Sequence, residues 1–127
     1  MKVRDQMTRN IVTVSPQTSL GEARHLLEAT HLRCLPVVTA GRLVGLLLQS
    51  DPRLVSARAD TPVQEMMAPA TVSIGPKARI EQAARLMLEH DIRGLPVVDQ
   101  EGILLGVLTT TDLLAVMVKV PPVSIWY

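Results

Sequence analysis

An internal repeat of about sixty residues constrains the fold of this 127-residue chain more than any other feature. At an offset of 60, the matching positions include Val3 with Val63, Met7 with Met67, Pro16 with Pro76 and residues 35–38 with 95–98. One extra residue near Glu101 shifts the offset to 61, which matches Gly45 with Gly106 and Asp51 with Asp112. A register held across half of a chain indicates a duplication.

Each repeat predicts the same order of elements. A first short strand ends at a proline, and apolar residues at helical spacing follow it in residues 20–27 and 80–87. Two β-rich runs joined by a glycine-containing turn predict a hairpin in residues 35–48 and 95–109. Polar residues then open a second helix: Ser50 and Asp51 in one repeat, Thr111 and Asp112 in the other.

The predicted fold is therefore α/β, with two β-α-β-β-α repeats at residues 1–60 and 61–118 and a tail at 119–127. Half-chains of this size cannot cover both faces of a sheet. We therefore expect the two repeats to pack together with pseudo-two-fold symmetry.

Composition narrows the class of protein. Thirteen basic and 12 acidic side chains give a net charge of +1, and no Phe occurs. The aromatic residues are Trp126 and Tyr127 at the end of the chain, so the core must be aliphatic. The balance of charge and the lack of interior rings argue against nucleic-acid binding. The single cysteine, Cys34, and the absence of a leader or membrane-length apolar run predict a soluble cytoplasmic protein.

Four duplicated motifs resemble the CBS domain and its tandem form, the Bateman module. They are residues 3–7 and 63–67, 12–16 and 72–76, 32–38 and 92–98, and 106–113 with a weaker copy at 45–52. The resemblance spans nearly all of residues 1–118. It implies a binding module rather than an enzyme, with AMP, ADP, ATP or sometimes S-adenosylmethionine held in two clefts between the repeats.

The resemblance also implies which residues line each cleft. Cleft A would join Val12, Leu32, Arg33 and Pro36 to Thr109, Thr111 and Asp112. Cleft B would join Val72, Ile92, Arg93 and Pro96 to Ser50 and Asp51.

The residue types suit a nucleotide. A carboxylate accepts hydrogen bonds from ribose hydroxyls, whereas hydroxyl side chains, arginine and a helix N-terminus favour phosphate. We expect cleft B to be the weaker cleft, because Leu48 replaces the hydroxyl of Thr109 and Pro52 removes a backbone N–H.

Simpler roles are open for the same residues. Asp51 and Asp112 are suited to capping helices, and Arg33 and Arg93 to forming surface ion pairs. Cys34 has no local signature of a nucleophile, and the histidine spacing does not favour a metal site. No catalytic motif is present.

The sequence thus predicts a stand-alone regulatory module that binds an adenine nucleotide and signals energy or metabolite status to a partner protein. The apolar stretch 113–118 predicts a homodimer. One alternative is a dimerisation or interaction module without a ligand, and a second is nucleic-acid binding. The preferred nucleotide and the role of the tail are left open.

Overall fold

Contacts divide the chain into two units, each assembled from separate segments. Unit 1 comprises residues 1–11, 72–100 and the chain from 105 onward, and unit 2 comprises residues 12–71 and 101–104. The structure, a computed structural model, describes residues 1–30, 32–70 and 72–119. The tail beyond residue 119, with Trp126 and Tyr127, lies outside the described residues. These units differ from the repeats at residues 1–60 and 61–118, which were defined by matching sequence. The boundary between the repeats at residue 60 stays a prediction.

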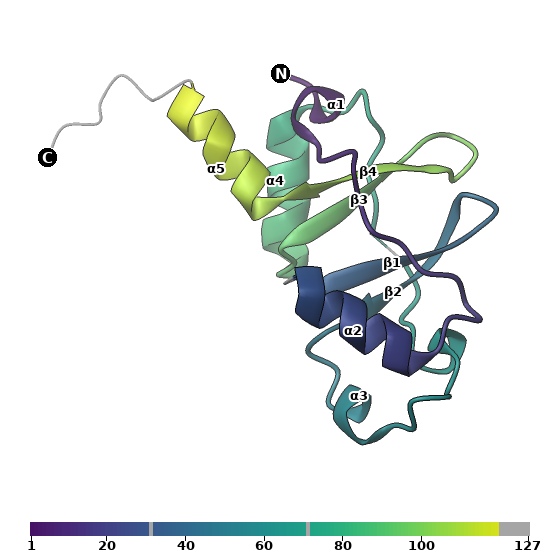
Figure 1. The fold of residues 1–127 in the computed structure, drawn as a ribbon. Coiled ribbons are helices and arrows are strands. Elements are labelled where there is room, and N and C mark those ends of the chain that lie inside the picture. Colours follow the sequence, from purple (N-terminus) through teal and green to yellow (C-terminus); the bar gives the residue numbers. More distant parts are fainter. Residues whose placement is uncertain (31, 71, 120–127) are drawn as a thin grey trace, which may run out of the picture. The chain divides into compact units, whose positions relative to one another are not determined.

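Unit 2 is a β-hairpin with three helical segments (Figure 1). Its elements are α2 (Leu20–Thr30), β1 (Cys34–Thr39), β2 (Arg42–Leu48), α3 (Arg53–Ser56) and the 3-10 turn η1 (Val63–Glu65). The β1 and β2 strands are antiparallel, as predicted. Ala40 and Gly41 join them with φ of 51° and 81°, the positive values that a tight two-residue hairpin turn requires.

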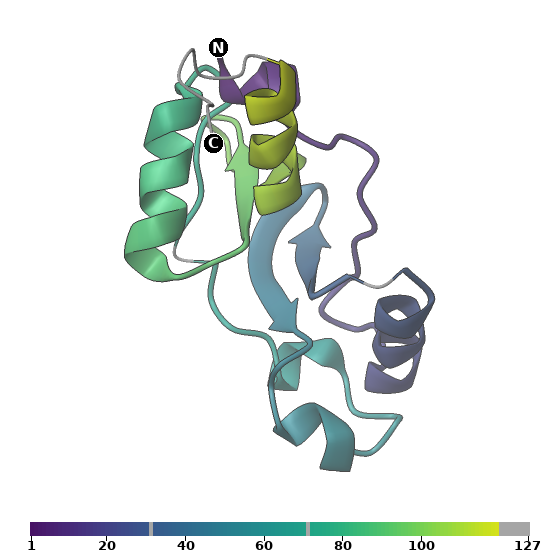
Figure 2. The same ribbon diagram turned by 90° about the vertical axis from the view of Figure 1, so that its left-hand side faces the viewer.

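Unit 1 repeats this arrangement around β3 and β4 (Figure 2). Its elements are α1 (Val3–Gln6), α4 (Ile80–His90), β3 (Gly94–Val98), β4 (Leu104–Thr109) and α5 (Thr110–Lys119). The α1 segment lies against α5, although the two are at opposite ends of the sequence. None of the helices in the described residues is long and apolar enough to cross a membrane.

The predicted first strand of each repeat is reduced to a single parallel bridge. Val14 pairs with Val37, and Ile74 pairs with Val97 in the same way. The Val14 N–H donates to Pro36 O at 3.0 Å, and the Val38 N–H donates to Val14 O at 2.8 Å. A proline stands two residues after each bridge and has no N–H to extend the ladder.

Both cores are aliphatic, which confirms the expectation from composition. In unit 1, the side chains of Val3, Leu95, Val97 and Leu108 are fully buried in one cluster. In unit 2, the fully buried cluster members are Leu20, Leu35, Val37, Leu47 and Val63, with Ala23 alongside. Among the described residues, no polar or charged residue is buried.

The second helix differs between the repeats. The α5 helix has 10 residues, whereas α3 has four. The α3 carbonyls have another partner, since Arg24 Nη1 donates to Leu54 O at 3.0 Å and to Ala57 O at 3.4 Å. The Arg24 guanidinium thus binds carbonyl oxygens that the N–H groups of a further helical turn would otherwise bind.

Each lead-in segment pairs with a strand at a glycine. The Thr8 N–H donates to Val107 O at 2.9 Å, and the Val107 N–H donates to Thr8 O at 3.0 Å. Leu46 and Ala68 form the equivalent pair of bonds in unit 2. A Cβ on Gly106 would lie 2.7 Å from Thr8 O, closer than real Cβ contacts allow. The bridge therefore requires glycine at this position.

We predict that Gly106→Ala destabilises the protein by about 1–3 kcal/mol, because the new methyl group must displace backbone rather than a flexible side chain. The matched control is Gly75→Ala, where a Cβ would meet nothing within 4 Å. It should change stability by less than about 1 kcal/mol. Urea unfolding followed by circular dichroism measures both, and equal stabilities for the two variants would contradict the prediction.

Candidate functional site

Asp112 lies at the start of α5 within a reciprocal cap. The Thr109 N–H donates to Asp112 Oδ2 at 2.8 Å, and the Asp112 N–H donates to Thr109 Oγ1 at 3.2 Å. This is the capping-box arrangement, with Thr109 as the N-cap and an aspartate three residues later. The predicted cap is therefore present, but α5 begins at Thr110 rather than at the expected Thr111–Asp112 pair. The helix starts earlier because Thr109, the end of β4, supplies the capping oxygen.

A third contact reaches Asp112 from the lead-in segment. Thr8 Oγ1 donates to the carboxylate, at 3.2 Å from Oδ1 and 3.3 Å from Oδ2. Thr109 Oγ1 lies 3.0 Å from Oδ2. These partners are hydroxyls and a backbone N–H, so they orient the carboxylate without neutralising its charge. Thr8 was not predicted from the sequence. The signal that could have identified it is a difference between the repeats, since Thr8 has a hydroxyl and its equivalent, Ala68, does not.

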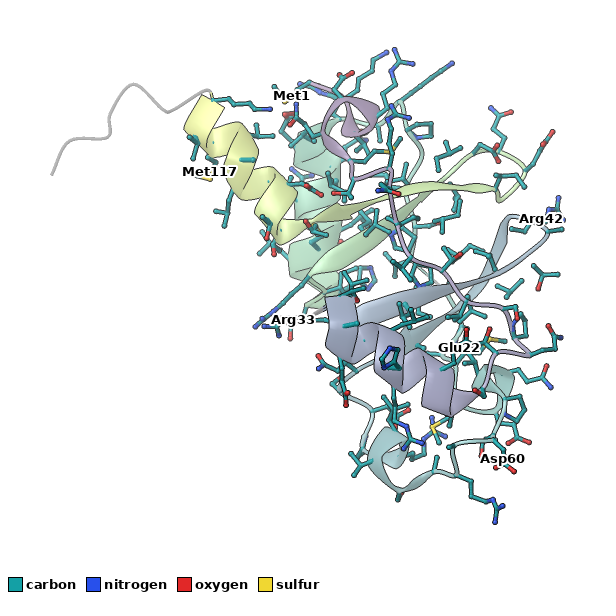
Figure 3. The ribbon with its side chains drawn as sticks, in the orientation of Figure 1. Met1, Glu22, Arg33, Arg42, Asp60 and Met117 are labelled. Carbon is teal, nitrogen blue, oxygen red and sulfur yellow. The ribbon has the colours of Figure 1, made fainter. Side chains whose placement is uncertain are left out.

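Arg93 lies beside the same helix start. The Thr110 N–H donates to the Arg93 carbonyl oxygen at 3.1 Å. In unit 2, the Gln49 N–H donates in the same way to the Arg33 carbonyl oxygen at 2.9 Å. Both arginine side chains are exposed, and Figure 3 shows Arg33 at the edge of the hairpin. Within each unit, the structure therefore joins the arginine segment to the helix start of the same repeat.

Asp51, the repeat equivalent of Asp112, is bound by Arg53. Arg53 Nη2 lies 2.7 Å from Asp51 Oδ2, and Arg53 Nε lies 3.1 Å from Oδ1. The Arg53 backbone N–H also donates to Oδ1 at 3.0 Å. The prediction that Ser50 and Asp51 begin this helix is wrong, because α3 begins at Arg53 and its N-cap residue is Pro52. The hydrogen bonds from the Arg53 side chain and backbone hold the pKa of Asp51 below its usual value. Sequence reasoning did not identify Arg53.

The remaining predicted site residues are distributed over both units. Unit 1 holds Val72, Ile92, Arg93, Pro96, Thr109, Thr111 and Asp112. Unit 2 holds Val12, Leu32, Arg33, Pro36, Ser50 and Asp51. Pro36 and Pro96 are buried in their strands, and Ser50 and Thr111 are exposed. Because cleft A and cleft B each draw on both units, their membership stays a prediction.

No metal site is found in the part of the chain that the structure describes, where no three His, Cys, Asp or Glu side chains are grouped to hold an ion. Cys34 begins β1 and is half-buried. Burial raises the pKa of its thiol to about 11, because desolvation penalises the thiolate. Cys34 is thus a poor nucleophile at neutral pH.

Comparison with known proteins gives consistent results. The family model for the CBS domain matches residues 3–53 and 63–119. The CBS domain-containing protein YhcV of Bacillus subtilis is 38% identical over 115 residues, covering 87% of this chain and 81% of YhcV. Inosine-5'-monophosphate dehydrogenase of Korarchaeum cryptofilum is 32% identical over 104 residues, but these make up only 22% of that enzyme.

Two solved structures share the fold. CBSX2 of Arabidopsis thaliana, in complex with AMP, has a TM-score of 0.85 at 31% identity, covering 95% of this chain and 98% of CBSX2. The cytosolic domain of the Mg²⁺ channel MgtE, in complex with ATP, has a TM-score of 0.77 at 35% identity, covering 87% of this chain and 46% of that one. Together with the two matches to the family model, these likenesses show that the chain belongs to the CBS domain family and carries two CBS repeats.

Proposed function

We propose that this chain is a regulatory module that binds an adenine nucleotide reversibly and conveys its occupancy to a partner protein. The observation that carries the proposal is the Asp112 carboxylate, which neutral donors hold at the start of α5. The AMP complex of CBSX2 and the ATP complex of the MgtE domain support the ligand class.

The chemistry at this helix start suits a nucleoside phosphate. Asp112 can accept hydrogen bonds from both ribose hydroxyls, while its charge repels phosphate. The positive end of the α5 dipole and the guanidinium of Arg33, the arginine predicted for cleft A, favour phosphate instead. We place this ligand in cleft A, with a weaker site in cleft B. The composition leaves aliphatic residues, prolines and strand backbone to hold the adenine.

We further propose that the chain is not itself an enzyme. Its match to inosine-5'-monophosphate dehydrogenase covers about a fifth of that protein. Among the described residues, the candidate site offers a carboxylate, hydroxyls and exposed arginines. Burial raises the pKa of the Cys34 thiol, which makes it a poor nucleophile. With one cysteine in the sequence, we expect the protein in the reducing cytoplasm.

We predict that Asp112→Asn weakens AMP binding by about tenfold or more, since a charge-assisted bond to a ribose hydroxyl contributes about 1.5–3 kcal/mol. Asp51→Asn should weaken binding far less, because cleft B is the weaker site. Calorimetry with AMP, ADP, ATP and S-adenosylmethionine measures both variants. Equal losses would contradict the assignment of cleft A.

The same titrations separate the alternative functions. A ligand that binds only the folded state raises the melting temperature. If none of the four ligands does so, a dimerisation module without a ligand is favoured over the proposal. Nucleic-acid binding would instead appear as binding that weakens steeply with salt.

Thr8 provides a second test of the same site. We predict that Thr8→Val weakens AMP binding severalfold, because the methyl group cannot donate to Asp112. Thr8→Ser keeps the hydroxyl and should restore the affinity. AMP and its 2′,3′-dideoxy analogue measure whether the loss acts through the ribose: the variant should bind the analogue as the unaltered chain does. An equal loss for both ligands would mean that Thr8 acts only on the fold.

The exposed face of α5 favours self-association as a second property. Leu114, Met117 and Val118 are 60%, 57% and 81% exposed, and α5 has no buried residue. Figure 3 shows Met117 on the side of α5 that faces away from β3 and β4. Apolar residues grouped on one exposed helix are typical of interaction surfaces. We propose that α5 contributes to a homodimer.

We predict that Met117→Glu shifts the protein from dimer to monomer, because the new carboxylate would be desolvated in the interface. Gln100→Glu adds the same charge at an exposed hairpin turn and should leave the dimer intact. Light scattering coupled to gel filtration measures the mass of each. A monomeric unaltered chain at high concentration would contradict the proposal.

A further inference from the structure

The duplication places two equivalent aspartates in different electrostatic surroundings. Asp112 is held by hydroxyls and a backbone N–H, whereas Asp51 is paired with a guanidinium. We infer that Arg53 withholds Asp51 from a ribose, so that Asp112 is the chain's single ribose-binding carboxylate. This inference rests on the proposed function. It concerns how many of the proposed nucleotide sites bind the ribose through a carboxylate.

The Arg53 side chain and backbone fill the acceptor positions of Asp51. Oδ1 accepts from Arg53 N at 3.0 Å and from Nε at 3.1 Å, while Oδ2 accepts from Nη2 at 2.7 Å and from Nε at 3.3 Å. A carboxylate offers about four lone-pair positions, so these bonds leave no good site for a ribose hydroxyl. A fork of donors on both oxygens is also the strongest geometry for this type of pair.

Arg53 is held in place on its other side as well. Its Nη2 also lies 3.5 Å from Met66 O, in the segment that follows η1. The Asp51 side chain is only 16% exposed, while that of Arg53 is 62% exposed. The guanidinium is therefore the more exposed member of the pair, and the carboxylate has little surface left for a ligand.

Asp112 differs in the charge of its partners and in the oxygen that binds them. Both Thr109 donors lie on Oδ2, at 2.8 and 3.0 Å. Asp112 Oδ1 accepts the Thr8 hydroxyl at 3.2 Å, a long distance for an O–H···O bond, whose usual value is about 2.7–2.8 Å. Oδ1 therefore keeps a lone pair for a ribose hydroxyl while Thr8 holds the carboxylate in place. At Asp51, Arg53 occupies both oxygens, so a ribose hydroxyl would have to displace a cation.

Three sequence differences between the repeats produce the contrast. Arg53 corresponds to Leu114, Leu48 to Thr109 and Ala68 to Thr8. The first adds a cation beside Asp51. The other two leave Asp51 without counterparts of the hydroxyl donors that orient Asp112. The local backbone differs too: Asp51 precedes α3, whereas Asp112 and Leu114 both lie within α5, where residues two apart do not face each other.

Exchange of Arg53 for the residue of the second repeat, Arg53→Leu, tests the inference. Calorimetry with AMP and with 2′,3′-dideoxy-AMP reports ribose discrimination as the ratio of the two affinities. Arg58→Leu is the matched control, because Arg58 Nε lies 3.2 Å from Asp60 Oδ1 in another exposed pair of unit 2.

We expect the unaltered chain and Arg58→Leu to show one site that prefers AMP. Arg53→Leu should add or strengthen a second such site by about fivefold, the range for loss of a competing exposed ion pair. That gain should disappear when Asp51→Asn is added.

The outcomes against the inference are distinct. If Arg53→Leu weakens binding of both ligands, Arg53 contacts phosphate and the inference is wrong. If the unaltered chain binds AMP and the exchange changes nothing, the inference fails while the proposed function stands. If neither the unaltered chain nor any variant binds a nucleotide, the proposed function fails and takes the inference with it.

Discussion

The antiparallel bridge between Thr8 and Val107 is the contact on which the rest of unit 1 depends. It ties the N-terminal segment to β4, where Gly106 allows the two backbones to approach. The same bridge brings the Thr8 hydroxyl to Asp112, 104 residues further along the chain. One backbone pairing therefore stabilises the unit and orients the carboxylate of the candidate site.

The equivalent bridge in unit 2 shows what duplication preserves and what it lets diverge. Leu46 and Ala68 form the same backbone hydrogen bonds beside Gly45, because those bonds do not depend on side chains. The side chains have changed around this constant frame. Asp51 has a cation beside it because residue 53 is arginine. It has no counterpart of the Thr8 hydroxyl because residue 68 is alanine. Divergence in this chain thus acts on the side chains of the site and on the length of the second helix, while the bridge and the hairpin stay the same.

Features that follow from local pattern could be predicted from the sequence. The hairpin turn at Ala40–Gly41 and the cap at Asp112 depend on neighbouring residues, and the aliphatic core follows from composition. The contacts that were missed join distant segments. No periodicity shows that Thr8 would reach Asp112. The short α3 depends on Arg24, whose guanidinium binds carbonyls 30 or more residues away.

The α5 helix connects the two properties proposed for this protein. Its first turn carries Asp112, and the same helix exposes Leu114, Met117 and Val118. The reciprocal cap fixes the first turn, so Asp112 and the exposed apolar residues share one continuous helix. A nucleotide can change self-association only if it binds the two association states with different affinity. Asp112 and Leu114 are two residues apart within α5, so they face different sides of the helix. The same helix can therefore present a carboxylate to a ligand on one face and apolar side chains to a partner copy on another.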